Sequence, residues 1–277
     1  MKQLIIEGQK ELTGEIKISG AKNSVVALIP AAILSDEEVT LYNVPNISDT
    51  NALIDIIELL KGKVDYKDEV MKIDTHNIEN LVVPENLSKK LRASYYFMGA
   101  LLAKFKYAEI YFPGGCNIGS RPIDLHLKGF EALGATIEHD EETHKYIVSA
   151  EKLVGTRIKL DFASVGATIN IMFAAVKAEG QTIIENAAKE TEIINIAEFL
   201  NKMGAKISGA GTSQIVIDGV NRLIGTTISV IPDRIEGGTY LLIGSLLGDN
   251  LQVCGVNPDH ISSLLNKLKD MGVSYKI

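Results

Sequence analysis

Residues 113–125, PGGCNIGSRPIDL, hold the side chains best suited to chemistry in this sequence. Three glycines flank Cys116 and leave the backbone free to turn sharply, and Arg121 follows five residues later. A cysteine in an exposed glycine-rich loop near cations can act as an acid, a base or a nucleophile. The alternative is a small apolar side chain in a loop. We favour function at Cys116, because a structural cysteine normally lies inside an element, as we expect for a core Cys254 in LQVCGV.

Three further candidates fall at the starts of predicted helices: Lys22 with Asn23, Arg92, and the SVGAT stretch at 164–168. The N-terminus of a helix has unpaired N–H groups and the positive end of the dipole, which suits phosphate. Lysine or arginine is unfavourable there, so an anionic ligand would explain these cations. The alternative is that Ser164 only caps its helix and the cations are solvated. Together the three sites predict a pocket for a polyanionic small molecule.

Other signals are weaker. Residues 209–214, GAGTSQ, lie between two β-runs and predict a hairpin turn rather than a nucleotide loop. His139 and His144 occupy a polar hairpin loop, HDEETH, with no cysteine or further histidine close by in the sequence, so we expect no metal site there. We expect His126 and His260 to be surface or packing residues. No motif requires a cofactor.

Composition excludes several classes. The 277 residues are 46% apolar and 23% charged, as in a folded globular protein, and the net charge is −7. Proteins that bind nucleic acid are normally basic, so nucleic acid is not expected as a partner. The longest apolar run, 25–34, is too short to span a membrane, which needs about 20 residues. Two cysteines make no disulfide framework, so we expect a cytoplasmic protein.

One unit recurs along the chain. Similar helical stretches, about 70 residues apart, end at glycines that we expect to cap them: Gly62, Gly134, Gly204 and Gly272. Each unit has an apolar helix, a short β-run, a more amphipathic helix and then two β-runs. The apolar helices are predicted at 22–34, 92–103, 166–178 and 237–247, and we expect them to be buried on most sides.

The fourth unit lacks a return strand after its predicted last strand, VSYKI at 273–277. A strand without a partner leaves backbone groups unpaired, so we interpret the chain as a fragment or as completed by another chain. The sequence thus predicts a complete three-repeat domain at 22–230 and a partial second domain from 1–21 plus 231–277. We expect that partial domain to self-associate through 231–277.

Seven stretches resemble the enolpyruvyl transferase family, and within it the UDP-N-acetylglucosamine 1-carboxyvinyltransferases. In chain order they are ISGAKN, LRAS, PGGCNIGSRPIDLHLKGFEALGA, SVGATI, IIENAAKETEI, NKMGAKISGAGT and PDRIEGGT. The resemblance covers the whole chain. It implies an α/β (α+β) fold of two similar domains, each an inside-out α/β barrel of three βαβαββ-type repeats, with the active site between them. Six repeats are implied and about four are present.

The resemblance implies transfer of the enolpyruvyl group of phosphoenolpyruvate to the 3′-hydroxyl of UDP-N-acetylglucosamine, with release of phosphate. This is the first committed step of peptidoglycan synthesis, and so serves cell shape and division. Two other functions remain open: a non-catalytic UDP-sugar-binding protein and a 3-phosphoshikimate carboxyvinyltransferase. The second lacks a matching cysteine loop and usually has serine in the Ala-Lys-Asn position.

By the same resemblance, Cys116 protonates the methylene carbon of phosphoenolpyruvate, forms an adduct with it and is alkylated by fosfomycin. Lys22, Asn23 and Arg121 match phosphoenolpyruvate contacts. The residues that match UDP-N-acetylglucosamine contacts are Arg92, Arg121, Pro122, Ile123, Asp124, Leu125, Ser164, Val165 and Gly166. No metal is implied. Phe162 stands where many members have a lysine.

The family's aspartate base for the sugar hydroxyl has no match in this sequence. Asp233 and Glu236, in PDRIEGG, are not taken to replace it. Because the predicted second domain is only partial and lacks this base, we expect the chain by itself to be inactive.

Overall fold

The computed structural model describes residues 3, 5, 7–8, 11–112, 122–140 and 142–277. Cys116 and Arg121 lie outside these residues. The chain forms two compact units, a larger one of Lys22–Ile231 and a smaller one of Met1–Ala21 with Pro232–Ile277.

Three buried helices form the centre of the larger unit. They are α1 (Lys22–Ala31), continued by the 3₁₀ helix η1 (Ala32–Leu34); α4 (Tyr96–Phe105), preceded by η2 (Arg92–Tyr95); and α6 (Val165–Ala175). Each is apolar nearly all round, which is stable only where protein surrounds the helix. Every α4 residue from Tyr96 to Ala103 is buried, for example. The prediction of buried helices is confirmed for these three. It is wrong for the fourth, at 237–247, where only Gly237 and Gly238 are buried, because few elements of the smaller unit pack around this helix.

Amphipathic helices pack against these three. They are α2 (Ser48–Leu59), α5 (Asp124–Ala132) and α7 (Thr191–Lys202), with a single turn, α3 (Glu85–Ser88). Helices α2 and α7 contact α1, and α5 contacts α6. Each buries one face and leaves the other in solvent, as its alternation of apolar and charged residues predicts.

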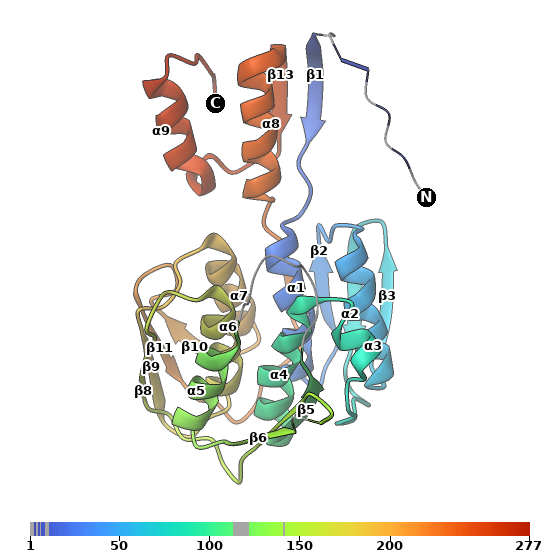
Figure 1. Ribbon diagram of the computed structural model, residues 1–277, viewed down its shortest axis with the longest axis vertical. Helices are drawn as coiled ribbons and strands as arrows, with labels where there is room; N and C mark the ends of the chain where they lie inside the picture. The colour runs from blue at the N-terminus through green and yellow to red at the C-terminus, as the bar shows by residue number, and fades with distance from the viewer. Residues whose placement is uncertain (1–2, 4, 6, 9–10, 113–121, 141) are drawn as a thin grey trace. The chain divides into compact units, whose positions relative to one another are not determined.

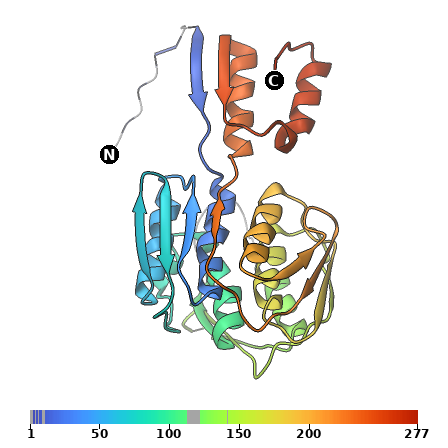
Figure 2. The same cartoon turned by 180° about the vertical axis from the view of Figure 1, so that it is seen from behind.

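Three sheets complete the larger unit. The strands are β2 (Val39–Tyr42), β3 (Lys63–Lys67), β4 (Val70–Asp74), β5 (Tyr107–Tyr111), β6 (Thr136–Asp140), β7 (Lys145–Ser149), β8 (Arg157–Lys159), β9 (Gln181–Glu185), β10 (Lys206–Ser208), β11 (Gln214–Asp218) and β12 (Thr227–Ser229). The sheet orders are β12-β2-β4-β3, β5-β7-β6 and β10-β11-β9-β8. Figures 1 and 2 show the β2 and β8 sheets on opposite sides of this unit, with α1 and α4 between them.

The repeat seen in the sequence recurs as strand order. In each sheet the first strand of a repeat pairs antiparallel with the third, and the third with the second: β2-β4-β3, β5-β7-β6 and β9-β11-β10. Strand β12, which follows the third repeat, pairs parallel with β2 of the first. This pairing links the last segment of the larger unit to its first sheet.

One predicted helix cap is wrong by a residue. Three of the four predicted glycines adopt positive φ, at Gly134, Gly204 and Gly272. After α2, however, the positive φ of 69° belongs to Lys61, and Gly62 has no such φ. A Cβ on Gly62 would lie 2.6 Å from Ile57 Cγ2, so glycine is required there by packing and not by backbone conformation.

The smaller unit has a two-stranded parallel sheet and two helices. Its elements are β1 (Leu12–Lys17), α8 (Arg234–Leu247), β13 (Gly248–Cys254), η3 (Pro258–Ile261) and α9 (Ser262–Asp270). Residues 240–277 line a cavity of about 800 Å³ within this unit. None of the described helices is long and apolar enough to cross a membrane.

Two predictions for the smaller unit are wrong. Residues 273–277 form no strand: the Val273 N–H donates to Leu268 O at 2.9 Å, and no described strand pairs with the segment. Cys254 lies in a strand as predicted, but it is half-buried and not in the core. In the described part of the chain only β1 pairs with β13, so the sheet is too narrow to enclose the thiol, which borders the cavity.

Candidate functional site

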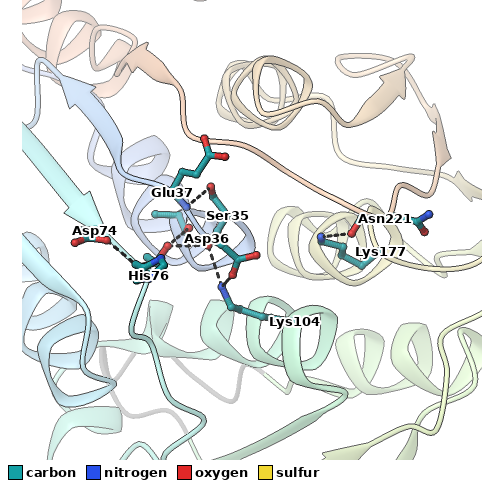
Figure 3. Close-up of polar contacts among 10 residues, drawn as sticks. Ser35, Asp36, Glu37, Asp74, His76, Lys104, Lys177 and Asn221 are labelled. Atoms are coloured by element: carbon teal, nitrogen blue, oxygen red, sulfur yellow. Dashed lines mark hydrogen bonds and ion pairs between the residues drawn. The ribbon is translucent and has the colours of Figure 1, made fainter.

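The C-terminal ends of the three central helices meet at one end of the larger unit. Lys104, in the last turn of α4, donates to Ser35 O at 2.9 Å just after η1 and pairs with Asp36 at 2.6 Å. Lys177 follows α6 and donates to Asn221 O; burial lowers its pKa, which the nearby Asp36 opposes. Figure 3 shows Asp36, Lys104 and Lys177 facing one another.

These lysines neutralise the negative ends of the helices, which is a structural role. Because their C-terminal ends meet, the three helices run in parallel, and each is about 15 Å long. Their N-termini accordingly lie at the opposite end. Those N-termini carry Lys22, Arg92 (through η2) and Ser164, so the fold places the three predicted anion sites on one end of the helix bundle.

Lys22 and Asn23 are the first two residues of α1, and both side chains have access to solvent. The Lys22 Nζ lies 2.5 Å from Asp49 Oδ2 in the first turn of α2. The carboxylate thus offsets a cation at an unfavourable helix position. Asp49 was not singled out from the sequence. The sequence shows it only as an acidic residue in the first turn of a predicted helix, and many helices have one.

Arg92 begins η2 and is half-buried. Its guanidinium carbon lies 5.8 Å from the centre of the Tyr95 ring, a cation–π contact that restricts the side chain. Arg92 is therefore held in place before any ligand arrives.

The start of α5 alternates between anchored and exposed residues. Ile123, the N-cap, and Leu125 are almost fully buried, whereas Pro122 and Asp124 are exposed. Ile123 O accepts from the N–H of His126 at 3.0 Å, which closes the first turn. The buried pair fixes the segment, and the exposed pair is open to a ligand.

The start of α6 presents backbone N–H groups. Ser164 caps the helix, its Oγ accepting from Ala167 N–H at 3.3 Å, and Val165 and Gly166 are half-exposed. Gly166 is required by a close approach: a Cβ there would lie 2.8 Å from Tyr95 Oη and 2.9 Å from His126 Cε1. The predicted cap is confirmed, and an anion can reach the helix start only from its exposed side.

His126 connects three of these segments. Its ring centre lies 4.8 Å from that of Tyr95, edge to face, and its Nδ1 lies 2.8 Å from Asn170 Nδ2. Burial, and next the positive charge of Arg92, lower the pKa of His126 to about 3. Its expected packing role is consistent with its burial; it is not a surface residue.

The hydrogen bond from Asn170 and the contacts with Tyr95 and Gly166 therefore join η2, α5 and α6 around one neutral imidazole. Sequence reasoning missed Tyr95 and Asn170. They lie 31 and 44 residues from His126, so only the fold reveals the cluster.

Phe162, where a lysine was expected by resemblance, is 59% exposed beside the start of α6. The preceding Asp161 pairs with Lys128 of α5 at 3.4 Å. A cation therefore lies near this loop, although it comes from a different element.

The remaining predictions concern hairpins and metals. The predicted hairpin turn at 209–214 is confirmed: residues 209–213 connect the antiparallel strands β10 and β11. The prediction that His139 lies in a hairpin loop is wrong, because His139 belongs to β6, where it pairs with Tyr146 of β7 and stacks on its ring. Among the described residues, no three His, Cys, Asp or Glu side chains gather in a way that could hold a metal ion.

The sequence comparisons identify the family. The family model described as EPSP synthase (3-phosphoshikimate 1-carboxyvinyltransferase) matches residues 6–276. The chain belongs to this family. Two solved structures share its fold. An enolpyruvyl transferase, NikO, from Streptomyces tendae has a TM-score of 0.86 at 24% identity over 98% of this chain and 65% of that chain. EPSP synthase from Acinetobacter baumannii has a TM-score of 0.74 at 19% identity over 97% and 61%.

Relatives named for a different activity are much more similar in sequence. The chain is 53% identical over 274 residues to UDP-N-acetylglucosamine 1-carboxyvinyltransferase 2 of Bacillus anthracis, covering 99% of the chain and 63% of that protein. It is 52% identical over 273 residues to UDP-N-acetylglucosamine 1-carboxyvinyltransferase of Streptococcus pneumoniae serotype 2, covering 99% and 65%. The chain thus spans less than two thirds of the length of these relatives.

Proposed function

We propose that this chain serves the transfer of the enolpyruvyl group of phosphoenolpyruvate to the 3′-hydroxyl of UDP-N-acetylglucosamine, which releases phosphate and begins peptidoglycan synthesis. The observation that carries the proposal is the 53% identity, across 99% of the chain, to enzymes named for this reaction. The common end of α1, η2–α4 and α6 supports it, because both substrates are polyanions and this end gathers cations and helix N-termini.

In the proposed reaction, a general base takes the proton of the sugar hydroxyl as its oxygen bonds to the phosphate-bearing carbon, and the methylene carbon gains a proton. The new methyl group then returns its proton to the donor, and the bond from carbon to the phosphate oxygen breaks. Phosphate leaves with the bonding electrons and takes up the hydroxyl proton from the base or from solvent. Cys116 is the proposed proton donor, because a thiol can give and take a proton near neutral pH. Cations are needed beside the charged intermediate, and we assign Lys22 and Arg121 to this task, with Asn23 as a further contact.

For the sugar nucleotide we propose the larger set drawn from η2 and the starts of α5 and α6. Its members are Arg92, Arg121, Pro122, Ile123, Asp124, Leu125, Ser164, Val165 and Gly166. The half-exposed N–H groups of α6 suit the diphosphate. The exposed Asp124 carboxylate suits the uracil N–H, which needs an acceptor.

The test is phosphate release from phosphoenolpyruvate by this chain, with and without UDP-N-acetylglucosamine. We expect release that depends on the sugar nucleotide where another chain supplies a base for the sugar hydroxyl, and none from this chain alone. Cys116→Ala abolishes it, and Cys254→Ala, which removes the chain's other cysteine, does not. Fosfomycin is expected to alkylate Cys116 and leave Cys254 unmodified, as peptide mass spectrometry would show.

Full activity of Cys116→Ala, or release that ignores the sugar nucleotide, would contradict the proposal. Binding of UDP-N-acetylglucosamine by calorimetry without any phosphate release would favour the non-catalytic alternative instead.

We also propose that residues 22–230 act as a complete three-repeat domain in the cytoplasm, and that the smaller unit self-associates. Leu246 and Leu247 of α8 are 81% and 63% exposed, an apolar surface that water disfavours. Leu246→Lys with Leu247→Lys should reduce the sedimentation-derived mass at high concentration. Val154→Lys, at an exposed apolar residue of the larger unit, is the control. A monomer in the unmodified chain at high concentration would contradict the proposal.

A further inference from the structure

Asn170 of α6 uses its whole amide to tie three elements together. Its Oδ1 accepts from Gly99 N–H of α4 at 3.0 Å. Its Nδ2 donates to Tyr95 O at 3.1 Å and lies 2.8 Å from His126 Nδ1. An amide nitrogen has two hydrogens and the oxygen has none, so this arrangement is satisfied in one orientation of the amide only.

The orientation of Asn170 determines the state of His126. With both Nδ2 hydrogens on acceptors, the His126 Nδ1 must be the acceptor, and the single ring proton is on Nε2. In an imidazolium, the Nδ1–H and the amide N–H of Asn170 would be two donors facing each other without an acceptor, and a second positive charge would lie near Arg92. The nitrogen Nε2 and carbon Cε1 then lie against Gly166, where a Cβ would come within 3.0 Å of both.

We propose that His126 is a positioning residue: its neutral imidazole sets the spacing between Arg92–Tyr95, the first turn of α5 and the first turn of α6, so that the three can bind one diphosphate ester together. The inference rests on the proposed function, which supplies UDP-N-acetylglucosamine as that ester. His126 acts through Tyr95, Asn170 and Gly166 and is not proposed to touch the substrate. It has no place in the proton transfers assigned to Cys116.

Two substitutions separate positioning from simple filling of space. His126→Phe keeps a ring but leaves Asn170 Nδ2 with a buried, unpaired N–H. His126→Asn loses the ring but can place an acceptor oxygen near the former Nδ1. We expect His126→Phe to weaken binding of UDP-N-acetylglucosamine about tenfold, as for the loss of one buried hydrogen bond, and His126→Asn to restore most of that affinity.

The matched control is Thr75→Val. Thr75 is fully buried and its Oγ1 donates to Ser35 O at 2.7 Å, at the C-terminal end of the helix bundle. This variant should lower the melting temperature without changing affinity. If His126→Phe also lowers only the melting temperature, or if Phe binds as well as Asn, the positioning role is refuted.

Calorimetry with UDP-N-acetylglucosamine, UDP and inorganic pyrophosphate separates the two proposals. If the unmodified chain binds UDP or pyrophosphate but not the sugar nucleotide, the proposed function fails, and the His126 variants are then compared on UDP. If it binds none of the three, both proposals fail. Nitrogen NMR of labelled histidine adds an independent readout: we expect a fixed Nε2–H tautomer between about pH 5 and 8, and a titrating His126 would overturn the inference.

Discussion

Acidification from pH 7 to pH 5 should destabilise the chain by about 2 kcal/mol through His126 alone. In the unfolded state the imidazole has its ordinary pKa of 6.5, and in the folded state its pKa is about 3. Below pH 6.5 the unfolded chain therefore binds a proton that the folded chain does not. The stability due to His126 is complete above that pH and is lost as the pH falls toward 3.

A pH of 5 lies 1.5 units below the unfolded-state pKa of 6.5, and each unit lowers the free energy of unfolding by about 1.36 kcal/mol. Because pH 5 is well above the folded-state pKa, the unfolded-state value alone sets this figure. The groups that face the imidazole are the cation of Arg92 and the phenol of Tyr95 from η2, and the neutral Gly166 and Asn170 from α6. Gly166 and Asn170 have no ionisable side chain, and a guanidinium stays protonated throughout this range, so these groups do not mask the effect.

The assay is urea unfolding at several pH values, followed by far-ultraviolet circular dichroism because the chain has no tryptophan. The unmodified chain is compared with His126→Asn, which has no titrating side chain at this position. Carboxyls such as Asp36 and Glu109, whose pKa values Lys104 and Lys145 lower, weaken both proteins equally in acid and cancel in the difference. Thr75→Val should keep the pH dependence of the unmodified chain. Parallel curves for the unmodified chain and His126→Asn would refute the reasoning.

Three further outcomes are expected. Gly99→Ala should lower the free energy of unfolding by about 1–3 kcal/mol in urea, because its Cβ would lie 2.5 Å from Asn170 Oδ1 and 2.7 Å from Asn170 O; an unchanged midpoint would mean that α4 and α6 separate freely. Gly166→Ala should weaken UDP-N-acetylglucosamine binding in calorimetry, because Tyr95 and His126 must move to admit the methyl group; equal affinity would show that this spacing is not used. Lys104→Met should reduce stability by about 0.5–1.5 kcal/mol, because Ser35 O loses one of its two donors and keeps Thr75 Oγ1, while ligand affinity stays the same; a change in affinity would disprove the purely structural role of the C-terminal cluster.

The sequence alone was sufficient for the order of elements. Apolar helices, amphipathic helices and hairpins were predicted where the structure has them, because side-chain periodicity and turn residues act locally. Helix starts were also readable, and Ser164 does cap α6. Predictions from local sequence failed where contacts with other elements determine the structure. A strand at 273–277 needs a partner, burial of Cys254 needs a wider sheet, and Gly62 is required by contact with Ile57.

The residues of the candidate site also fall into those predicted from local sequence and those that only the fold brings together. Lys22, Arg92 and Ser164 were found by type and position, since a cation or a cap at a helix start has a local meaning. Their gathering at one end depends on the parallel packing of three helices, and the His126 cluster depends on contacts across 44 to 75 residues of sequence. A histidine is neutral or charged according to what surrounds it, and that environment exists only once α5 and α6 have packed together.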